Sequence, residues 1–385
     1  MSARIFFHVQ HLLGIGHLRR AATLARALSA AGFDVLLVSG GAPVAGLSLG
    51  GARLHQLPPL RAADESLRDL ARLDGAPVDA SFERARSAEL LALLDAEAPN
   101  IVITEQFPFG RTRLRFELLP LLDAARARRP RPLIVCSVRD VVRRSAKAER
   151  VAETEEHLGR FFDAVMVHGD PRLVPFERSF AGWPRIRGRA FYTGYVAERE
   201  LGPRPGAGDG SGEVVVSVGG GAVGAPLLKA ALAARPMTAL AERPWRLLVG
   251  NDVPMAERST LAGGPGIVIE PARADFTQLL RRAALSISQA GYNTAIETLC
   301  CADRAVLVPF GSARETEQAD RAAAFAERGM VALVPLDTLS PKSLADAVAR
   351  ALAGPSLRLF PPPDVNGGSV TASLLHRLLK EARPV

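Results

Sequence analysis

The strongest constraint on the fold is the way short apolar runs alternate with amphipathic, helix-like stretches. Five runs of the first half are strand-like: RIFFHV, FDVLLVSGG, NIVITEQ, PLIVCSV and FDAVMVHGD. The stretches that separate them have helical spacing, near residues 17–31, 81–99, 113–129 and 149–162. Repeated strand–helix units of this kind predict a parallel sheet with helices on its faces.

The alternation stops once, at residues 202–212, and then begins again. The interruption, GPRPGAGDGSG, consists almost wholly of Gly, Pro and small polar residues, which cannot build a core and are typical of a linker. Beyond it the strand-like runs are EVVVSVGGG, WRLLVGN, GIVIE, ALSISQAG, AVLVPF and MVALVPL. A chain of 385 residues, 48% of them apolar, is long enough for two domains with a core each.

We therefore predict an α/β protein made of two Rossmann-like, doubly wound domains. The first covers residues 1–200, a linker follows at 201–212, and the second covers residues 213–368. Residues 369–385 are expected to form a last helix, which either caps the second domain or crosses back to the first. Ligands of open parallel sheets bind beyond the carboxyl ends of the strands, so we expect the two domains to face each other across a ligand-binding cleft.

Charge and cysteine content restrict the class of partner. The formal net charge is +8, and residues 1–196 hold 28 Lys+Arg against 21 Asp+Glu. A basic half attracts an anionic small molecule, an anionic membrane face or nucleic acid. The sequence has no zinc-finger spacing, RNP-type aromatic signature or lysine-rich tail, so we expect no nucleic acid partner. The three cysteines, two of them adjacent, have neither disulfide nor zinc spacing and are expected to be packing residues.

The sequence favours a cytoplasmic location. No apolar run reaches the roughly 20 residues of a membrane-spanning helix, and the N-terminus lacks the ordered features of a secretion signal. Contact with the inner membrane face is expected to be at most peripheral, through the arginines of FPFGRTRLRF (107–116) and RDVVRRSAKAER (139–150). A solvated helical face explains the same arginines.

The turn LLGIGH, between the first strand and the first helix, suits an anion. Gly14 and Gly16 allow positive φ and close backbone approach, and the helix behind them offers unpaired N–H groups and a positive dipole end. A tight strand–helix connection is the alternative interpretation. We expect no ordinary NAD site, because the third glycine of Gly-x-Gly-x-x-Gly and an acid at the end of the second strand are missing.

His17, in the first turn of that helix, is the candidate catalytic base. An imidazole can accept a proton near neutral pH, although a capping or surface histidine is the alternative. Asp140 and Asp170 each follow a strand and are further candidates for the base, with a structural role as their alternative. The side chains of His8 and His11 are expected to diverge, and no Cys or acid lies near them, so we expect no metal.

A second glycine cluster follows the first strand of the second half. In VVVSVGGGAVG, Ser217 ends the strand, and Gly219, Gly220 and Gly221 precede a helix. Backbone N–H groups in such a turn form a nest for phosphate. We expect a diphosphate to bind there.

The segment SISQAGYNTAIETLCCADRAVLVPF resembles the donor-sugar region of the two-Rossmann-domain (GT-B) glycosyltransferases, in particular the MurG-like peptidoglycan enzymes. The residues that carry the resemblance are Gly291 at the turn, Asn293 and Thr294 at the helix start, Glu297 six residues after the glycine, and Glu317 and Gln318 after VPF. The resemblance extends over most of the chain in order, but its specific part is the glycine turns. The first loop has fewer glycines than the family's, and the stretch after PF is one residue longer.

The resemblance implies an inverting, metal-independent transfer of a hexose from a nucleoside-diphosphate sugar, with UDP as the expected nucleotide and no further cofactor. It implies that Glu297 binds the ribose hydroxyls and that Arg273 marks the loop that contacts the base. The sugar is expected to contact Arg314, Glu317 and Gln318. Helix N–H groups behind the glycine cluster would stabilise the departing diphosphate without a divalent metal, in agreement with the lack of an Asp-x-Asp pair at a strand end.

Two other classes of function would use the same fold. A nucleotide-sugar hydrolase or epimerase needs the same donor contacts, with an activated water or ring acid–base groups in place of an acceptor. A non-catalytic nucleotide-sugar sensor would bind the donor without turnover. The acceptor itself cannot be read from the sequence, but the basic first half is compatible with an anionic or lipid-linked one.

Overall fold

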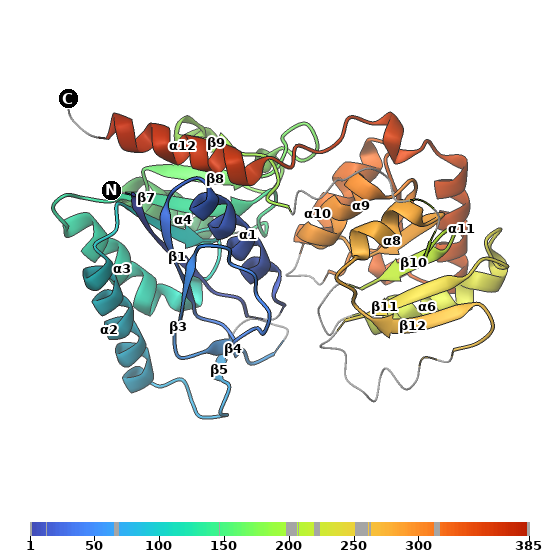
Figure 1. The fold of residues 1–385 in the computed structure, drawn as a ribbon, viewed down its shortest axis with the longest axis horizontal. Helices are drawn as coiled ribbons and strands as arrows, with labels where there is room; N and C mark the ends of the chain where they lie inside the picture. The colour runs from blue at the N-terminus through green and yellow to red at the C-terminus, as the bar shows by residue number, and fades with distance from the viewer. Residues whose placement is uncertain are drawn as a thin grey trace. The chain divides into compact units, whose positions relative to one another are not determined.

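The chain forms two compact units, residues 1–198 with 364–385 and residues 199–363. The computed structural model describes residues 2–12, 14–64, 69–145, 147–197, 206, 208–218, 224–250, 261, 263–311 and 316–382. Both units have a parallel sheet covered by helices (Figure 1), which confirms the predicted α/β class.

The sheet of the first unit has seven parallel strands in the order β3-β2-β1-β6-β7-β8-β9. These strands are β1 (Arg4–Val9), β2 (Asp34–Ser39), β3 (Arg53–Gln56), β6 (Ile101–Glu105), β7 (Leu133–Arg139), β8 (Ala164–His168) and β9 (Ala190–Tyr192). A separate antiparallel pair consists of β4 (Leu60–Ala62) and β5 (Leu70–Arg72). The helices are α1 (Gly16–Ala30), α2 (Ala80–Glu97), α3 (Arg115–Ala127), α4 (Ala148–Phe161), α5 (Trp183–Ile186) and α12 (Gly367–Glu381). The sequence predicts β1, β2, β6, β7 and β8 but not β3, β9 or the β4–β5 pair.

The sheet of the second unit has six parallel strands in the order β12-β11-β10-β13-β14-β15. They are β10 (Val214–Ser217), β11 (Trp245–Val249), β12 (Ile267–Pro271), β13 (Leu285–Ser288), β14 (Ala305–Leu307) and β15 (Ala332–Leu333). The described helices are α6 (Ala225–Ala234), α8 (Phe276–Arg282), α9 (Tyr292–Cys301), α10 (Glu317–Glu327) and α11 (Pro341–Ala353). Each strand corresponds to one of the apolar runs of the second half.

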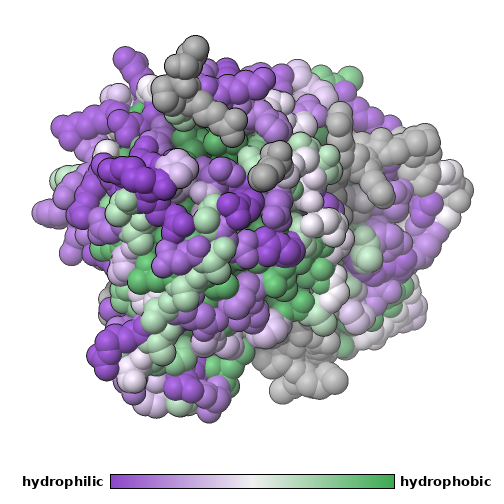
Figure 2. Space-filling model, turned by 60° about the vertical axis from the view of Figure 1, so that its left-hand side comes forward, coloured by the Kyte–Doolittle hydropathy of each residue, from purple (hydrophilic) through white to green (hydrophobic). Residues whose placement is uncertain are grey.

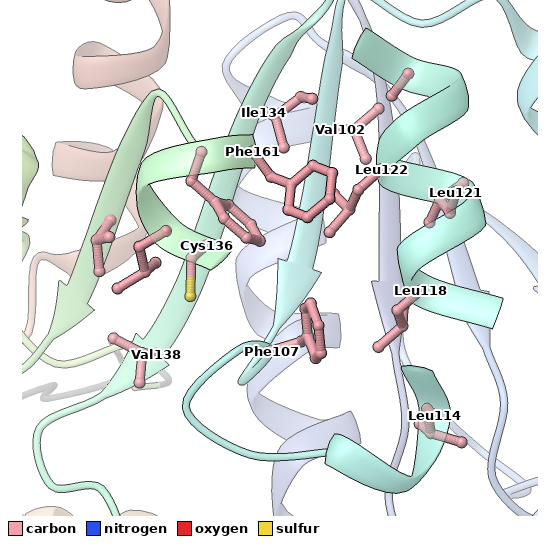
Figure 3. Close-up of a cluster of buried hydrophobic side chains, with 14 of the residues drawn as sticks. Val102, Phe107, Leu114, Leu118, Leu121, Leu122, Ile134, Cys136, Val138 and Phe161 are labelled. Carbon is pink, nitrogen blue, oxygen red and sulfur yellow. The ribbon is translucent and has the colours of Figure 1, made fainter. Parts of the chain in front are cut away.

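Side chains along the central strands alternate between two cores, as the two-residue period of a strand requires. Phe6 of β1 and Val102 of β6 point into a core with α2, α3 and α4, part of which Figure 3 shows. Ile5, Phe7 and Ile103 point into the opposite core, which α1 and α12 cover. Strands buried on both faces are continuously apolar, which is why these runs are so clear in the sequence.

A buried charged cluster fixes the start of the loop after β1. Arg86 on α2 donates from Nε to Glu117 Oε2 on α3 at 2.5 Å and from Nη2 to Gln10 Oε1 at 2.8 Å. Both charged side chains are fully buried. Arg86 also donates to the carbonyl of Gly40 at 3.1 Å, and a Cβ at Gly40 would lie 2.2 Å from two of these side-chain atoms. Only glycine therefore fits at this position.

The C-terminal segment belongs to the first unit. The N–H of Tyr195 donates to the carbonyl of Asp364 at 2.6 Å, and the N–H of Gly367 donates to the carbonyl of Tyr195 at 3.1 Å. From there α12 packs along α1, and a Cβ at Gly368 would lie 2.6 Å from Ala27 Cβ. The unit boundary falls between residues 363 and 364, five residues before the predicted one, because the chain already pairs with the first unit at Asp364.

None of the described helices is both long enough and apolar enough to cross a bilayer. Figure 2 shows hydrophilic side chains over much of one face, with smaller hydrophobic areas among them.

Removing one partner of the buried Arg86–Glu117 pair should cost far more than removing one partner of an exposed pair. Glu117→Ala leaves a buried guanidinium without its carboxylate, so we expect the free energy of unfolding to fall by about 3–5 kcal/mol. The control is Asp123→Ala, which removes an exposed 2.8 Å pair with Arg160 and should cost less than about 1 kcal/mol. Urea denaturation followed by circular dichroism measures both losses. Equal losses would contradict the interpretation.

Candidate active site

In each sheet the strand order reverses once, and the loops beyond the carboxyl ends of the strands at that point form the usual ligand site of a doubly wound fold. The reversal lies between β1 and β6 in the first unit and between β10 and β13 in the second. The turn with Gly14 and Gly16 follows β1, and the turn with Gly291 follows β13. Two of the three predicted glycine turns therefore lie at these points, and the third, at residues 219–221, lies outside the described residues.

His17, near the start of α1, contacts a carboxylate at the carboxyl end of β6. His17 Nδ1 lies 3.0 Å from Glu105 Oε1, and Arg20, one turn further along α1, contacts the same oxygen. Ser137 Oγ on β7 donates to Glu105 Oε2 at 2.7 Å. The Glu105 side chain is fully buried, whereas that of His17 is 12% exposed. The carboxylate thus orients a histidine that solvent can still reach.

The surroundings of His17 keep its imidazole neutral. Desolvation lowers the pKa of His17 well below 6.5, and the positive charges of Arg139, Arg111 and Arg20 lower it further. Because a carboxylate can only accept, the 3.0 Å contact with Glu105 places the proton of the neutral ring on Nδ1. The lone pair is then on Nε2, as a general base requires.

Of these residues, His17 is predicted from the sequence as a site residue, and Glu105, Arg20 and Ser137 are not. One signal for Glu105 exists: it is the acid that ends an otherwise nearly apolar run, IVITE, which forms the strand beside β1. Arg20 is buried on the α1 face that is otherwise apolar. An acid and a base that end or interrupt buried elements at one sheet edge are good candidates for a pair.

The first glycine turn differs from its prediction in one respect. Gly16 does not have a positive φ. A Cβ at Gly14 would meet no described atom within 4 Å, and one at Gly16 would meet only Arg139 Nη2, at 3.6 Å. The described fold therefore does not require glycine at either position. What the glycines provide is open space at a helix N-terminus with no acid in its first turn.

The other two candidates for the base have structural partners. Asp140 is fully buried and accepts from the Tyr195 hydroxyl at 3.3 Å. Asp170 pairs with Arg172 at 2.6 Å and accepts the N–H of Asp364 at 3.2 Å, which holds the returning C-terminal segment. Burial acts to raise the pKa of Asp170, but these hydrogen bonds hold it below its usual value. His17 is the better placed of the three for proton transfer.

In the second unit, four residues predicted to bind the nucleotide lie at the start of α9. Gly291 is the N-cap with φ of −58°, and a Cβ there would meet no described atom within 4 Å. Asn293 and Thr294 lie in the first turn, where N–H groups have no helical acceptor. Glu297 follows Thr294 by three residues and Asn293 by four, so the three side chains share one face of the helix.

Gln318, near the start of α10, connects two loops at the same edge of the sheet. Its Oε1 accepts the N–H of Ala290 at 3.0 Å and the N–H of Phe310 at 3.1 Å. The NH₂ end of the side chain is therefore the end that a ligand can contact. Glu317, beside it, is buried. Ser217 ends β10, whereas the predicted site residues Gly219, Gly220, Gly221 and Arg314 lie outside the described residues.

The guanidinium of Arg273 is occupied by carboxylates. It contacts Asp275 at 2.7 Å, Asp209 at 2.7 Å and Glu270 at 3.4 Å. Hydrogen bonds to Asp275 and Asp209 raise its pKa above the usual value. A base contact at this position is therefore left to the backbone of the loop after β12.

Acidification below pH 6.5 should destabilise the first unit. Burial lowers the pKa of His11 to about 4 and lowers the pKa values of His17 and His168 well below 6.5. The unfolded chain takes up these protons near pH 6.5 while the native state does not, so stability is complete above pH 6.5 and is lost as pH falls. Each histidine should cost about 1.4 kcal/mol between pH 7.5 and 5.5.

Urea denaturation at pH 7.5, 6.5 and 5.5 measures this loss, in a range above the titration of carboxylates. His168→Gln removes one of these buried groups and should reduce the loss by about 1.4 kcal/mol. A free energy of unfolding that does not change from pH 7.5 to 5.5 would show that these histidines take up protons in the native state as readily as in the unfolded chain.

The comparisons with known proteins agree with this arrangement. Residues 215–378 match the Glycosyltransferase family 28 C-terminal domain. The structure is similar to the glycotransferase of kitacinnamycin, with a TM-score of 0.61 and 16% identity over 99% of this chain and 96% of that one. It is also similar to Acinetobacter baumannii MurG, with a TM-score of 0.60 and 18% identity over 97% of this chain and 99% of that one.

A further similar structure is the spinosyn rhamnosyltransferase SpnG complexed with thymidine diphosphate, with a TM-score of 0.58 and 17% identity over 99% of this chain and 96% of that one. No curated protein matches the sequence. At these identities the solved structures establish the fold, and the domain match establishes the class of enzyme. The predicted resemblance is confirmed: the chain is a glycosyltransferase with the GT-B fold, and its residues 215–378 match the family 28 C-terminal domain.

Proposed function

We propose that the chain is an inverting, metal-independent glycosyltransferase that moves a hexose from a UDP-linked sugar to a hydroxyl group of an anionic or lipid-linked acceptor. The observation that carries the proposal is the neutral His17, oriented by a buried carboxylate 3.0 Å away at the switch point of the first sheet. A hydroxyl nucleophile needs such a base, because it loses its proton as it attacks.

The reaction follows from this assignment. His17 Nε2 takes the proton of the acceptor hydroxyl while the hydroxyl oxygen attacks the anomeric carbon of the sugar. The bond from that carbon to the diphosphate oxygen breaks, and the nucleoside diphosphate leaves with the electron pair. Attack from the side opposite the leaving group inverts the anomeric centre. Glu105 stabilises the imidazolium that forms.

The donor is proposed to bind along the start of α9. Gly291 admits the diphosphate to the helix N-terminus, whose dipole stabilises the charge that develops on departure. Glu297 accepts hydrogen bonds from the ribose hydroxyls, and the loop that contains Arg273 contacts the base. The glycines at 219–221 and Ser217 complete the diphosphate site. Arg314, Glu317 and the NH₂ group of Gln318 contact the hexose, and helix N–H groups take the place of a metal.

The arginines around His17 support an anionic acceptor. Arg20, Arg111 and Arg139 all act on His17 electrostatically, and Glu105 contacts it from β6. Arg111 donates to the carbonyl of Gln10 at 2.8 Å and so lies against the loop after β1. A carboxylate or phosphate near the acceptor hydroxyl would be attracted by these guanidinium groups. We place the reaction in the cytoplasm, with at most peripheral contact with the inner membrane face.

The proposal is tested by incubating the purified chain with a panel of UDP- and TDP-linked hexoses, with and without anionic and lipid-linked acceptors. Release of nucleotide that depends on an acceptor, with an inverted product, supports it. Release without any acceptor would instead indicate a hydrolase, and binding without release under all conditions would indicate a sensor.

His17→Ala should separate chemistry from donor binding. The variant lacks the base, so kcat should fall by about 10²–10⁴-fold. The Kd for UDP should stay within about twofold, because the donor residues lie on the second unit. Rapid quench measures the rate of transfer and calorimetry measures the Kd. Turnover at the wild-type rate in this variant would exclude His17 as the base.

Glu297→Ala should have the opposite effect. Loss of charged hydrogen bonds to the ribose should weaken UDP binding by about 10–100-fold. The matched control is Glu327→Ala, which removes an exposed glutamate from α10 in the same unit. Calorimetric titration with UDP and TDP measures both variants. An equal, small effect of the two substitutions would show that Glu297 is only a surface residue of its helix.

A further inference from the structure

The carboxylate of Glu105 is the end point of a buried chain of hydrogen bonds that crosses the carboxyl edge of the first sheet. Ser137 Oγ on β7 lies 2.7 Å from Glu105 Oε2 and 3.0 Å from His168 Nε2 on β8. His168 Nδ1 lies 2.8 Å from the hydroxyl of Thr193, which follows β9. At most 2% of each of these residues is exposed. The chain therefore spans four neighbouring strands without contact with water.

The number of protons available shows which group donates in each hydrogen bond of this buried series. A carboxylate only accepts and a serine hydroxyl has one proton, so Ser137 donates to Glu105. Ser137 has no second proton for His168, and the 3.0 Å contact is therefore a hydrogen bond from Nε2–H of His168 to Ser137 Oγ.

The second nitrogen of His168 follows from the same count. Burial and the nearby Arg20 charge lower the pKa of His168 well below 6.5, so the ring carries one proton, which is on Nε2. His168 Nδ1 then accepts from the Thr193 hydroxyl. Every donor in the chain points toward Glu105.

We propose that His168 and Ser137 are positioning residues for the reaction proposed above. They fix the Glu105 carboxylate so that its Oε1 holds the Nδ1–H of His17. Without the Ser137 hydrogen bond, the carboxylate loses one donor to Oε2 and is free to turn within the space that the bond occupied. His17 then loses both its ring orientation and the tautomer with the lone pair on Nε2.

The direction of the pH effect follows from the groups that face His17. These are Glu105 from β6, Arg20 on α1, Arg111 from the loop after β6, Arg139 at the end of β7 and His11 from the loop after β1. Among these groups the negative charge is that of Glu105. Without the Ser137 donor less of this charge is compensated by a hydrogen bond, and because the carboxylate remains beside His17 in any of its orientations, the pKa of His17 rises. The acid limb of the kcat profile should then move to higher pH.

Ser137→Ala and His168→Phe test the proposal, with Ser179→Ala as the matched control. Ser179 is a buried serine of the same unit whose Oγ accepts from the N–H of Val142, away from the chain. In both test variants we expect kcat to fall about tenfold, while the Kd for UDP stays unchanged. The acid limb should move to higher pH. His168→Gln keeps an N–H donor toward Ser137 and should therefore retain the wild-type pH profile of kcat.

A spectroscopic measurement separates this proposal from the proposed function. In protein with ¹⁵N-labelled histidine, His17 should carry its proton on Nδ1 and His168 on Nε2. In Ser137→Ala the shifts of His17 should change toward a mixture of tautomers, whether or not a glycosyl acceptor has been identified. His17 signals and pH profiles identical to those of Ser179→Ala would overturn the proposal. Loss of activity in His17→Ala together with unchanged signals in Ser137→Ala would leave the proposed base in place and reject the positioning role alone.

Discussion

The contacts of one carboxylate, that of Glu105, hold together the carboxyl edge of the first sheet. It receives Arg20 and His17 from α1 on one oxygen and Ser137 from β7 on the other. Its own strand, β6, pairs with β1 on one side and β7 on the other. One fully buried group therefore sets the position of the first turn of α1 relative to the sheet, and that turn holds the histidine that solvent can still reach.

The alternation of apolar runs predicts most of the fold because both sheets are parallel and buried on both faces. Strands such as β2 and β10 then contain continuous apolar segments, VLLV and VVV, with clear ends. The strands that the sequence does not reveal are short or at the edge. β3 has two exposed residues out of four and contains Arg53 and His55, and β9 has three residues. Their formation depends on the neighbouring strand more than on their own composition.

The candidate site is predicted less completely because its residues are far apart in the sequence. His17 is visible because a histidine beside two glycines at a strand–helix turn is a local pattern. Its partner Glu105 is 88 residues away, and only the strand order β1-β6 brings the two together. For Gly14 and Gly16 the sequence predicts the position of the turn but not the role of its glycines. Their pattern suggests an unusual backbone conformation, whereas in the structure a side chain at either position would find open space.

Two buried arginine–glutamate pairs hold the region around the loop after β1. Arg86–Glu117 acts from the face that α2 and α3 cover, and Arg20–Glu105 acts from the face that α1 covers. Apolar side chains of similar volume would stabilise the fold about as well, because desolvation of a buried ion pair offsets much of its attraction. Apolar contacts, however, have no direction and leave the rotation of a neighbouring ring unspecified. A base whose lone pair must point at a hydroxyl needs a partner that accepts along one line, and a buried carboxylate with all its donors in place provides that line.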